Sequence, residues 1–115
     1  MMDEKQKNAL ENLKQELRRG AIALVAMSRL QEAHYGYAMI RELNEQGFDV
    51  GQDTLYPLLR RLEEQGLLES EWRVEDPRPR RYYQLSQSGQ EAFEELLSEW
   101  KEQDKTIRRI IDESK

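Results

Sequence analysis

The chain has 115 residues, with 18 Lys or Arg against 23 Asp or Glu, so its formal net charge at pH 7 is -5. This length suits one domain, and so short a chain gains from burying further surface against a second copy. The absence of Cys and the presence of one His, His34, exclude disulfides, thiolate zinc sites and His-based catalytic centres, so we expect no metal, no cofactor and no enzyme activity.

Nothing in the sequence predicts a membrane segment or a secretory signal. The longest near-continuous apolar run covers residues 21–27, far short of the roughly 20 residues that span a bilayer. The first four residues include Asp3 and Glu4 and no basic residue, unlike the basic start of a signal peptide. We therefore expect a cytoplasmic protein with no membrane partner.

The first part of the chain predicts three helices. An amphipathic helix is expected over residues 3–18, where leucines recur at helical spacing: Leu10, Leu13 and Leu17. Residues 21–27 are apolar on nearly every side, which is typical of a buried helix, and this helix should end near Glu32. A short helix follows, opened by Tyr35-Gly36-Tyr37 and stopped by Gln46-Gly47.

A leucine stripe with the i, i+3, i+4, i+7 pattern predicts the fourth helix: Leu55, Leu58, Leu59 and Leu62. Its start offers N-cap chemistry in Gln52, Asp53 and Thr54. Pro57 is expected in the first turn, where its missing N–H costs nothing. Gly66 suits the end of the helix. With the leucines turned inward, polar side chains occupy the outer face.

Beyond Gly66 the pattern changes from helical to alternating. Residues 68–74 and 81–85 alternate in polarity around a proline-stiffened tip, which predicts a β-hairpin. A last helix, about 40 Å long at ~1.5 Å per residue, should begin after an N-cap at Ser86. Its heptad seam consists of Phe93, Leu97, Trp100, Asp104, Ile107 and Ile111. A small domain cannot cover so long a helix.

This order of elements predicts a mainly α-helical fold with a small β-hairpin wing, the winged helix-turn-helix, whose third packed helix enters the major groove of DNA. Arg can read guanine, Gln can read adenine, Thr can contact a thymine methyl group, and Tyr and Arg can bind phosphates. The candidate DNA contacts are Tyr37, then Gln52, Thr54, Tyr56, Arg60 and Arg61 on or beside the outer helix face, and Arg78, Arg80 and Arg81 of the hairpin.

Each of these candidates also has a purely structural explanation. Arg60 and Arg61 can be helix-surface charges balanced by Glu63 and Glu64. The hairpin arginines can protect an edge strand, and Arg81 can point inward. The tyrosines can simply flank the core.

The acidic excess is concentrated away from the expected DNA-binding surface. Residues 86–115 carry 5 basic and 8 acidic side chains, whereas residues 52–85 carry 6 and 7. A nearly balanced surface predicts modest, strongly salt-dependent affinity for one domain, so that two half-sites are needed.

The sequence also contains, in family order, Tyr35-Gly36-Tyr37, Thr54-Leu55-Tyr56-Pro57-Leu58-Leu59-Arg60-Arg61-Leu62-Glu63, Gly66-Leu67-Leu68, Trp72, Arg80-Arg81-Tyr82-Tyr83-Gln84-Leu85 and Gly89. Over roughly residues 18–90 it resembles the PadR-like transcriptional regulators. The resemblance implies a dimeric bacterial or archaeal repressor whose terminal helices form the dimer. The single C-terminal helix looks like the short branch that contains multidrug-sensing repressors, in which a Trp of the last helix stacks on flat aromatic drugs.

The resemblance extends the candidate sites to the two terminal helices. It implies a homodimer interface formed by Leu10, Leu13, Phe93, Leu97, Trp100, Ile107 and Ile111. Trp100 occupies the place of the drug-stacking Trp, and with Asp104 and Leu17 it forms the candidate site for a planar aromatic effector. Alternatively, Trp100 does no more than pack the dimer seam. Asp104 then sets the register of the seam or pairs with a basic residue across the dimer.

Three segments are therefore expected: an N-terminal helix for dimer packing (residues 1–18), a winged helix-turn-helix domain (19–85) and a dimerisation helix (86–115). The favoured hypothesis is a homodimeric repressor that binds a palindromic operator in double-stranded DNA and is modulated by the effector. The alternative is a ligand-sensing or protein-binding winged-helix module without strong DNA binding, for which the acidic balance is the argument.

Overall fold

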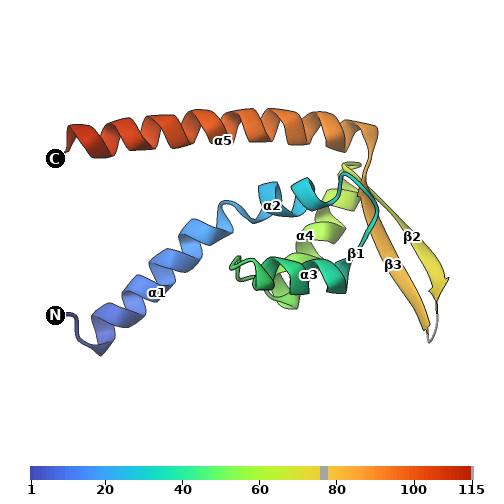
Figure 1. Cartoon of the computed structure of the whole chain (residues 1–115), viewed down its shortest axis with the longest axis horizontal. Helices are drawn as coiled ribbons and strands as arrows, with labels where there is room; N and C mark the ends of the chain where they lie inside the picture. The colour runs from blue at the N-terminus through green and yellow to red at the C-terminus, as the bar shows by residue number, and fades with distance from the viewer. Residues whose placement is uncertain (76–77, 115) are drawn as a thin grey trace.

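The computed structural model describes residues 1–75 and 78–114. In chain order its elements are α1 (Glu4–Arg19), α2 (Ile22–Arg29), β1 (His34–Tyr35), α3 (Gly36–Glu45), α4 (Gln52–Glu64), β2 (Leu68–Glu75), β3 (Arg78–Leu85) and α5 (Gln87–Glu113). Figure 1 shows α2, α3 and α4 grouped at the base of the wing formed by β2 and β3. The predicted winged helix-turn-helix, with its long C-terminal helix, is confirmed.

The hydrophobic core lies where these three helices meet the base of the sheet. Its largest fully buried side chains are Leu30, Met39, Leu55 and Leu59. All four leucines of the predicted stripe in α4 are buried, so the stripe determines which face of α4 is left outside. By contrast, no residue of α1 is buried.

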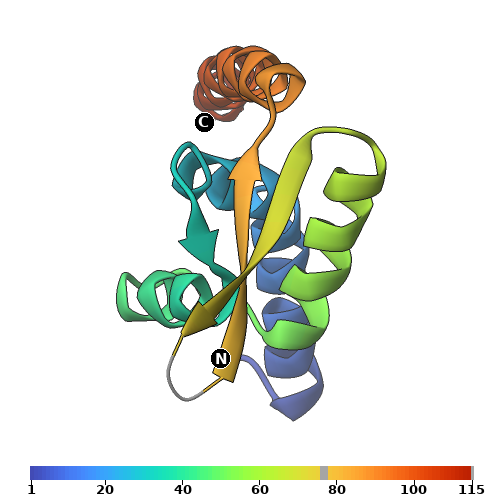
Figure 2. The same ribbon diagram turned by 90° about the vertical axis from the view of Figure 1, so that its right-hand side faces the viewer.

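The sheet has three antiparallel strands in the order β1-β3-β2, one more than the predicted hairpin. The additional strand, β1, pairs His34 with Tyr83 and Tyr35 with Tyr82. Two residues are too few to show the alternation that marks a strand in a sequence. In the hairpin, β2 and β3 pair without interruption from Leu68 opposite Leu85 to Glu75 opposite Arg78. Figure 2 shows α3 and α4 on either side of the hairpin. Asp76 and Pro77 of the predicted tip lie outside the described residues.

The start of α4 differs from the expectation. The helix begins at Gln52, and its N-cap is Gly51, whose backbone is extended and which offers no side-chain hydrogen bond. Pro57 therefore lies inside the helix, beyond the first turn in which it was expected. The leucine stripe explains this, because packing of Leu55 requires helical backbone before Pro57. Pro57 itself is exposed, so its ring meets solvent and not the core.

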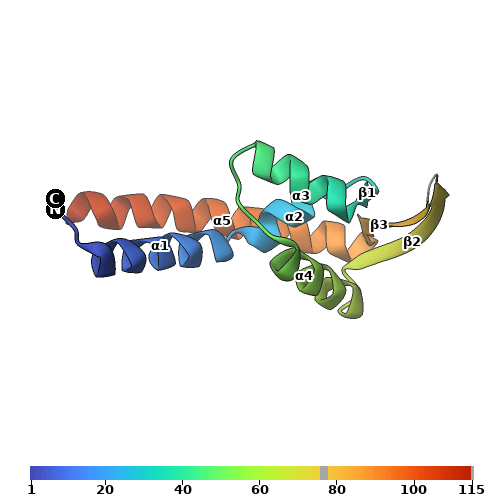
Figure 3. The same ribbon diagram turned by 90° about the horizontal axis from the view of Figure 1, so that it is seen from below.

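The two terminal helices project from the core on the side away from the wing (Figures 1 and 3). Ser86 is the N-cap of α5, as predicted, since its Oγ accepts a hydrogen bond of 3.0 Å from the Gly89 N–H. The molecule measures 55 × 34 × 23 Å. Within the described ranges, each helix is too short or too polar to cross a membrane.

Candidate nucleic-acid interface

The outer face of α4 carries the expected polar side chains. Gln52, Thr54, Arg60 and Arg61 are all exposed. Neither arginine forms an ion pair with a described residue. Glu63, which was one of the residues expected to balance them, is engaged elsewhere. Both guanidinium groups are therefore available to bind phosphates or base edges.

Tyr56 lies beside this face and leans against the start of α3. A Cβ atom added to Gly36 would lie 2.9 Å from Cε1 of Tyr56, so the absence of a side chain at Gly36 makes room for the ring. Burial, together with the nearby Tyr35, Tyr83 and Tyr37, raises the pKa of the Tyr56 hydroxyl above its ordinary value. The hydroxyl is thus protonated at neutral pH and can donate to a phosphate oxygen. Tyr37 is 48% exposed in the first turn of α3.

The three hairpin arginines lie in different environments. Arg78 is exposed, whereas the guanidinium carbon of Arg80 lies 5.0 Å from the ring centroid of Tyr35. Arg81 points inward, one of the two alternatives left open by the sequence. Its Nη2 lies 3.1 Å from Oε1 of Glu63 in α4, and its Nε donates to Oγ of Ser70 at 3.1 Å.

Glu63 thereby joins the wing to α4. Its Oε2 also accepts a hydrogen bond of 2.5 Å from Ser70 Oγ, so one carboxylate holds both strands of the wing. From the sequence, Glu63 is expected only to balance the charge of the helix arginines. On α4, Glu63 lies three residues after Arg60, and this spacing predicts a contact within the same helix. The contact of Glu63 with the wing depends instead on how the wing packs against α4. Arg81 and Glu63 are thus positioning residues for the surface that the remaining arginines form.

A hollow of about 260 Å³ separates the wing from the start of α3 and α4. It is lined by aromatic and basic side chains and one proline, which include Tyr56 of α4, Trp72 and Pro79 of the wing, and Arg80 and Arg81. The hollow thus brings Tyr56, on the flank of α4, next to the side chains of the wing. Trp72 was not among the expected contacts, although its place in an alternating strand put it on one face of the wing.

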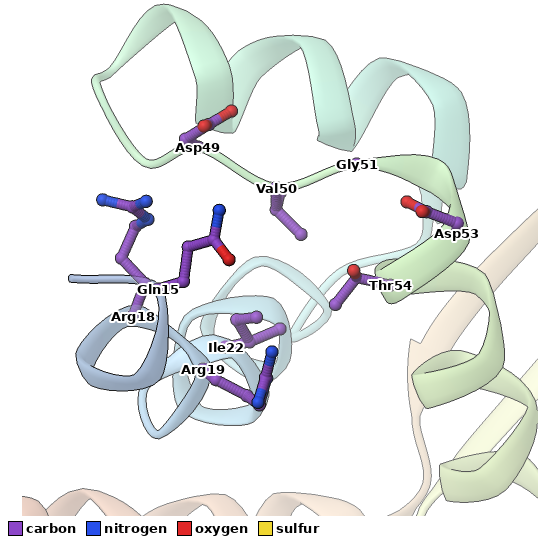
Figure 4. A pocket seen from close by; sticks show the side chains of 9 residues that line it. All are labelled: Gln15, Arg18, Arg19, Ile22, Asp49, Val50, Gly51, Asp53 and Thr54. Carbon is purple, nitrogen blue, oxygen red and sulfur yellow. The ribbon is translucent and has the colours of Figure 1, made fainter. Parts of the chain in front are cut away.

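A second hollow, of about 280 Å³, lies between the end of α1 and the start of α4 (Figure 4). Arg18 and Arg19 contribute positive charge, and Asp49 and Asp53 contribute negative charge. Because the four charges balance, the hollow shows no preference for an anion, and we assign no ligand to it. The described residues contain no group of three or more side chains placed to hold a metal ion.

The terminal helices expose most of the residues expected at the dimer interface and the effector site. Leu17 is 81% exposed and Trp100 is 47% exposed. Also exposed are Leu13, Ile107 and Ile111, while Leu10 and Leu97 are partly buried. Phe93 differs, because it lies in the core of its own chain, where the first turns of α5 pack on the domain. Asp104 pairs along its own helix with Arg108, at 3.1 Å.

The comparisons with known proteins agree with this geometry. Residues 24–95 match the family model described as the transcriptional regulator PadR-like family. A transcriptional regulator of Mycobacterium tuberculosis is 40% identical over 81 residues, which cover 70% of this chain and 76% of that protein. The matched family and the relatives found are transcriptional regulators and not enzymes.

Solved structures show the same fold. A PadR family regulator from Eggerthella lenta superposes with a TM-score of 0.90 at 34% identity, covering 95% of this chain and 97% of its own. The crystal structure of Bacillus subtilis PadR in complex with operator DNA superposes with a TM-score of 0.62 at 18% identity, over 67% of this chain and 45% of that one. The chain therefore belongs to the PadR-like family of transcriptional regulators.

Proposed function

We propose that the protein is a homodimeric repressor that binds a palindromic operator, with α4 in the major groove and the wing on the neighbouring backbone. The observation that carries the proposal is the pair of exposed guanidinium groups on α4, Arg60 and Arg61, which have no acidic partner among the described residues. The family and the operator complex of the similar Bacillus subtilis regulator support this role.

Dimer formation is supported by apolar side chains that the single chain leaves in water. They lie on both terminal helices: Leu13, Leu17, Trp100, Ile107 and Ile111. A second copy would cover the seam of α5 and the leucines of α1. In this proposal, residues 1–18 and 86–115 form the dimer, residues 19–85 form the DNA-binding domain, and the two-fold axis of the dimer matches the palindrome.

The proposal is tested by fluorescence anisotropy with a labelled duplex from the promoter of the protein's own gene. We expect two chains per duplex and a logarithmic slope of affinity against salt on the order of -5, because several phosphates are neutralised in each half-site. A shuffled duplex of the same composition is the control. A slope near zero, or equal affinity for both duplexes, would contradict operator binding and favour a protein-binding module.

Regulation by a planar aromatic effector is a second, compatible proposal. It is supported by Trp100, whose ring is half exposed on the face that the dimer would enclose, and by Asp104 one turn further along α5. An aromatic face next to a carboxylate suits a flat cation, which would take the place of Arg108 at Asp104. Binding between the two copies would change the spacing of the two α4 helices and so the affinity for the operator.

Replacing Trp100 by Ala should weaken binding of a flat cationic dye such as Hoechst 33342 by about 10-fold, since stacking on an aromatic ring contributes roughly 1 kcal/mol or more. Dye fluorescence measures the affinity, and Ile110→Ala, which shortens an exposed side chain of α5 outside the seam, is the matched control. Equal affinity of the native chain and Trp100→Ala would show that Trp100 only packs the dimer.

A further inference from the structure

One face of the wing exposes large apolar side chains. Trp72 is 65% exposed and Val74 is 91% exposed. The antiparallel register places Trp72 opposite Arg81 and Val74 opposite Pro79, and side chains of such opposed residues lie on the same face of a sheet. Trp72, Val74 and Pro79 therefore form a contiguous apolar patch near the end of the wing, which we call the wing patch.

The wing patch lies on the side of the sheet that α4 covers. Ser70 has the same orientation as Trp72, because side chains alternate along a strand, and its hydroxyl bonds to Glu63 of α4. Closer to the base, Leu68 on this face is buried in the core. The wing patch thus continues the core-facing side of the wing past the helix that covers its base.

The surroundings of the wing patch indicate what covers it. Trp72 and Pro79 line the hollow that also contains Tyr56 of α4, so the patch adjoins the flank of α4 beside its outer face. Arg80 and Arg81 line the same hollow, while Arg78 stands exposed at the end of the ribbon with its side chain on the opposite face. A nucleic acid strand presents alternating apolar sugars and charged phosphates, and this surface presents apolar rings beside guanidinium groups.

We infer that the wing patch packs against the deoxyribose groups of the operator strand that borders the groove entered by α4, with Trp72 as its main contact. This inference rests on the proposed function and adds residues to it. In this arrangement the apolar rings of the wing patch contact the sugars, while the arginines hold the phosphates. Because apolar contact releases no counterions, Trp72 contributes to affinity without contributing to its salt dependence.

Trp72 serves as its own reporter in the variant Trp100→Phe, in which it is the single Trp. Addition of the promoter duplex should at least halve the acrylamide quenching constant of Trp72. In the chain that keeps Trp100, Trp72→Ala should weaken operator binding about 30-fold, because a few tens of Å² of apolar contact are lost in each half-site. The slope of affinity against salt should not change. Trp72→Phe should retain most of the affinity.

Two controls separate this contact from its neighbours. Arg78→Ala should lower the salt slope, as expected for a residue that contacts phosphate. Ile110→Ala removes a comparably exposed apolar side chain from α5 and should leave affinity unchanged.

Three results would overturn the inference. The first is DNA binding that leaves Trp72 fully quenchable, and the second is a Trp72→Ala variant that changes the salt slope as Arg78→Ala does. The third is protection of Trp72 that rises with protein concentration in the absence of DNA, which would show that a second copy covers the wing patch. Failure of the native chain to bind its promoter would instead overturn the proposed function together with this inference.

Discussion

Replacement of both Arg60 and Arg61 by Ala should lower operator affinity about 1000-fold. The proposed dimer would lose four guanidinium groups in this variant. Each contact to a base or phosphate contributes roughly 1 kcal/mol or more, and affinity changes tenfold for every ~1.4 kcal/mol. The fold should be unaffected, because both side chains are exposed on α4 and have no ion pair to lose among the described residues. Anisotropy at several salt concentrations measures the effect.

The single variants Arg60→Ala and Arg61→Ala show which arginine binds phosphate and which reads a base. An arginine that binds phosphate lowers the salt slope and weakens all duplexes equally, whereas an arginine that reads guanine relaxes the preference for operator over shuffled DNA. The matched control is Lys105→Ala with Arg109→Ala, which removes the same charge from exposed positions of α5. Equal loss in this control would attribute the effect to net charge, and unchanged binding by the Arg60 and Arg61 variant would exclude α4 as the recognition helix.

The fold could largely be predicted because its main elements are marked by local patterns. The leucine stripe of α4 gave both the helix and its outer face, and Ser86 marked the start of α5 by ordinary capping chemistry. What was missed depends on tertiary contacts. The strand β1 has only two residues, and the position of Pro57 inside α4 follows from packing of the leucines and not from the preference of proline for a first turn.

The candidate site was predictable as a set of residue types but not as a set of environments. Arg78, Arg80 and Arg81 look alike in the sequence, yet the structure leaves Arg78 exposed, places Arg80 over Tyr35 and pairs Arg81 with Glu63. These differences come from the alternation of the strand combined with what packs on each face. The sequence shows the alternation, and only the structure shows that α4 covers one face.

A substitution at the junction between α4 and α5 should cause the second large effect, a loss of stability. The chain turns after α4 at Gly66, whose φ is +80°, and the Leu67 carbonyl accepts a hydrogen bond of 3.0 Å from the Ser86 N–H. The Ser86 hydroxyl donates to the Gly66 carbonyl at 2.6 Å. A Cβ atom at Gly89, in the first turn of α5, would lie 1.9 Å from the Leu67 carbonyl oxygen. Backbone therefore packs directly on backbone at this point.

Gly89→Ala should reduce the free energy of unfolding by about 3 kcal/mol, the upper part of the usual range for overpacking, and lower Tm by roughly 10 °C. Helix propensity alone predicts the opposite, since Ala is favoured over Gly in a helix by about 1 kcal/mol. The clash prevails because the obstacle is a carbonyl group fixed by hydrogen bonds and not the end of a flexible side chain. Thermal and urea unfolding followed by circular dichroism measure the change.

Gly20→Ala is the matched control for this substitution. Gly20 also lies at the end of a helix, its φ is -66°, and an added Cβ atom would meet only the Leu17 carbonyl oxygen at an ordinary 3.7 Å. It should leave Tm unchanged or raise it slightly. If Gly89→Ala also left Tm unchanged, α5 would have to shift away from Leu67 at little cost. The long C-terminal helix α5 would then not be held rigidly on the end of α4.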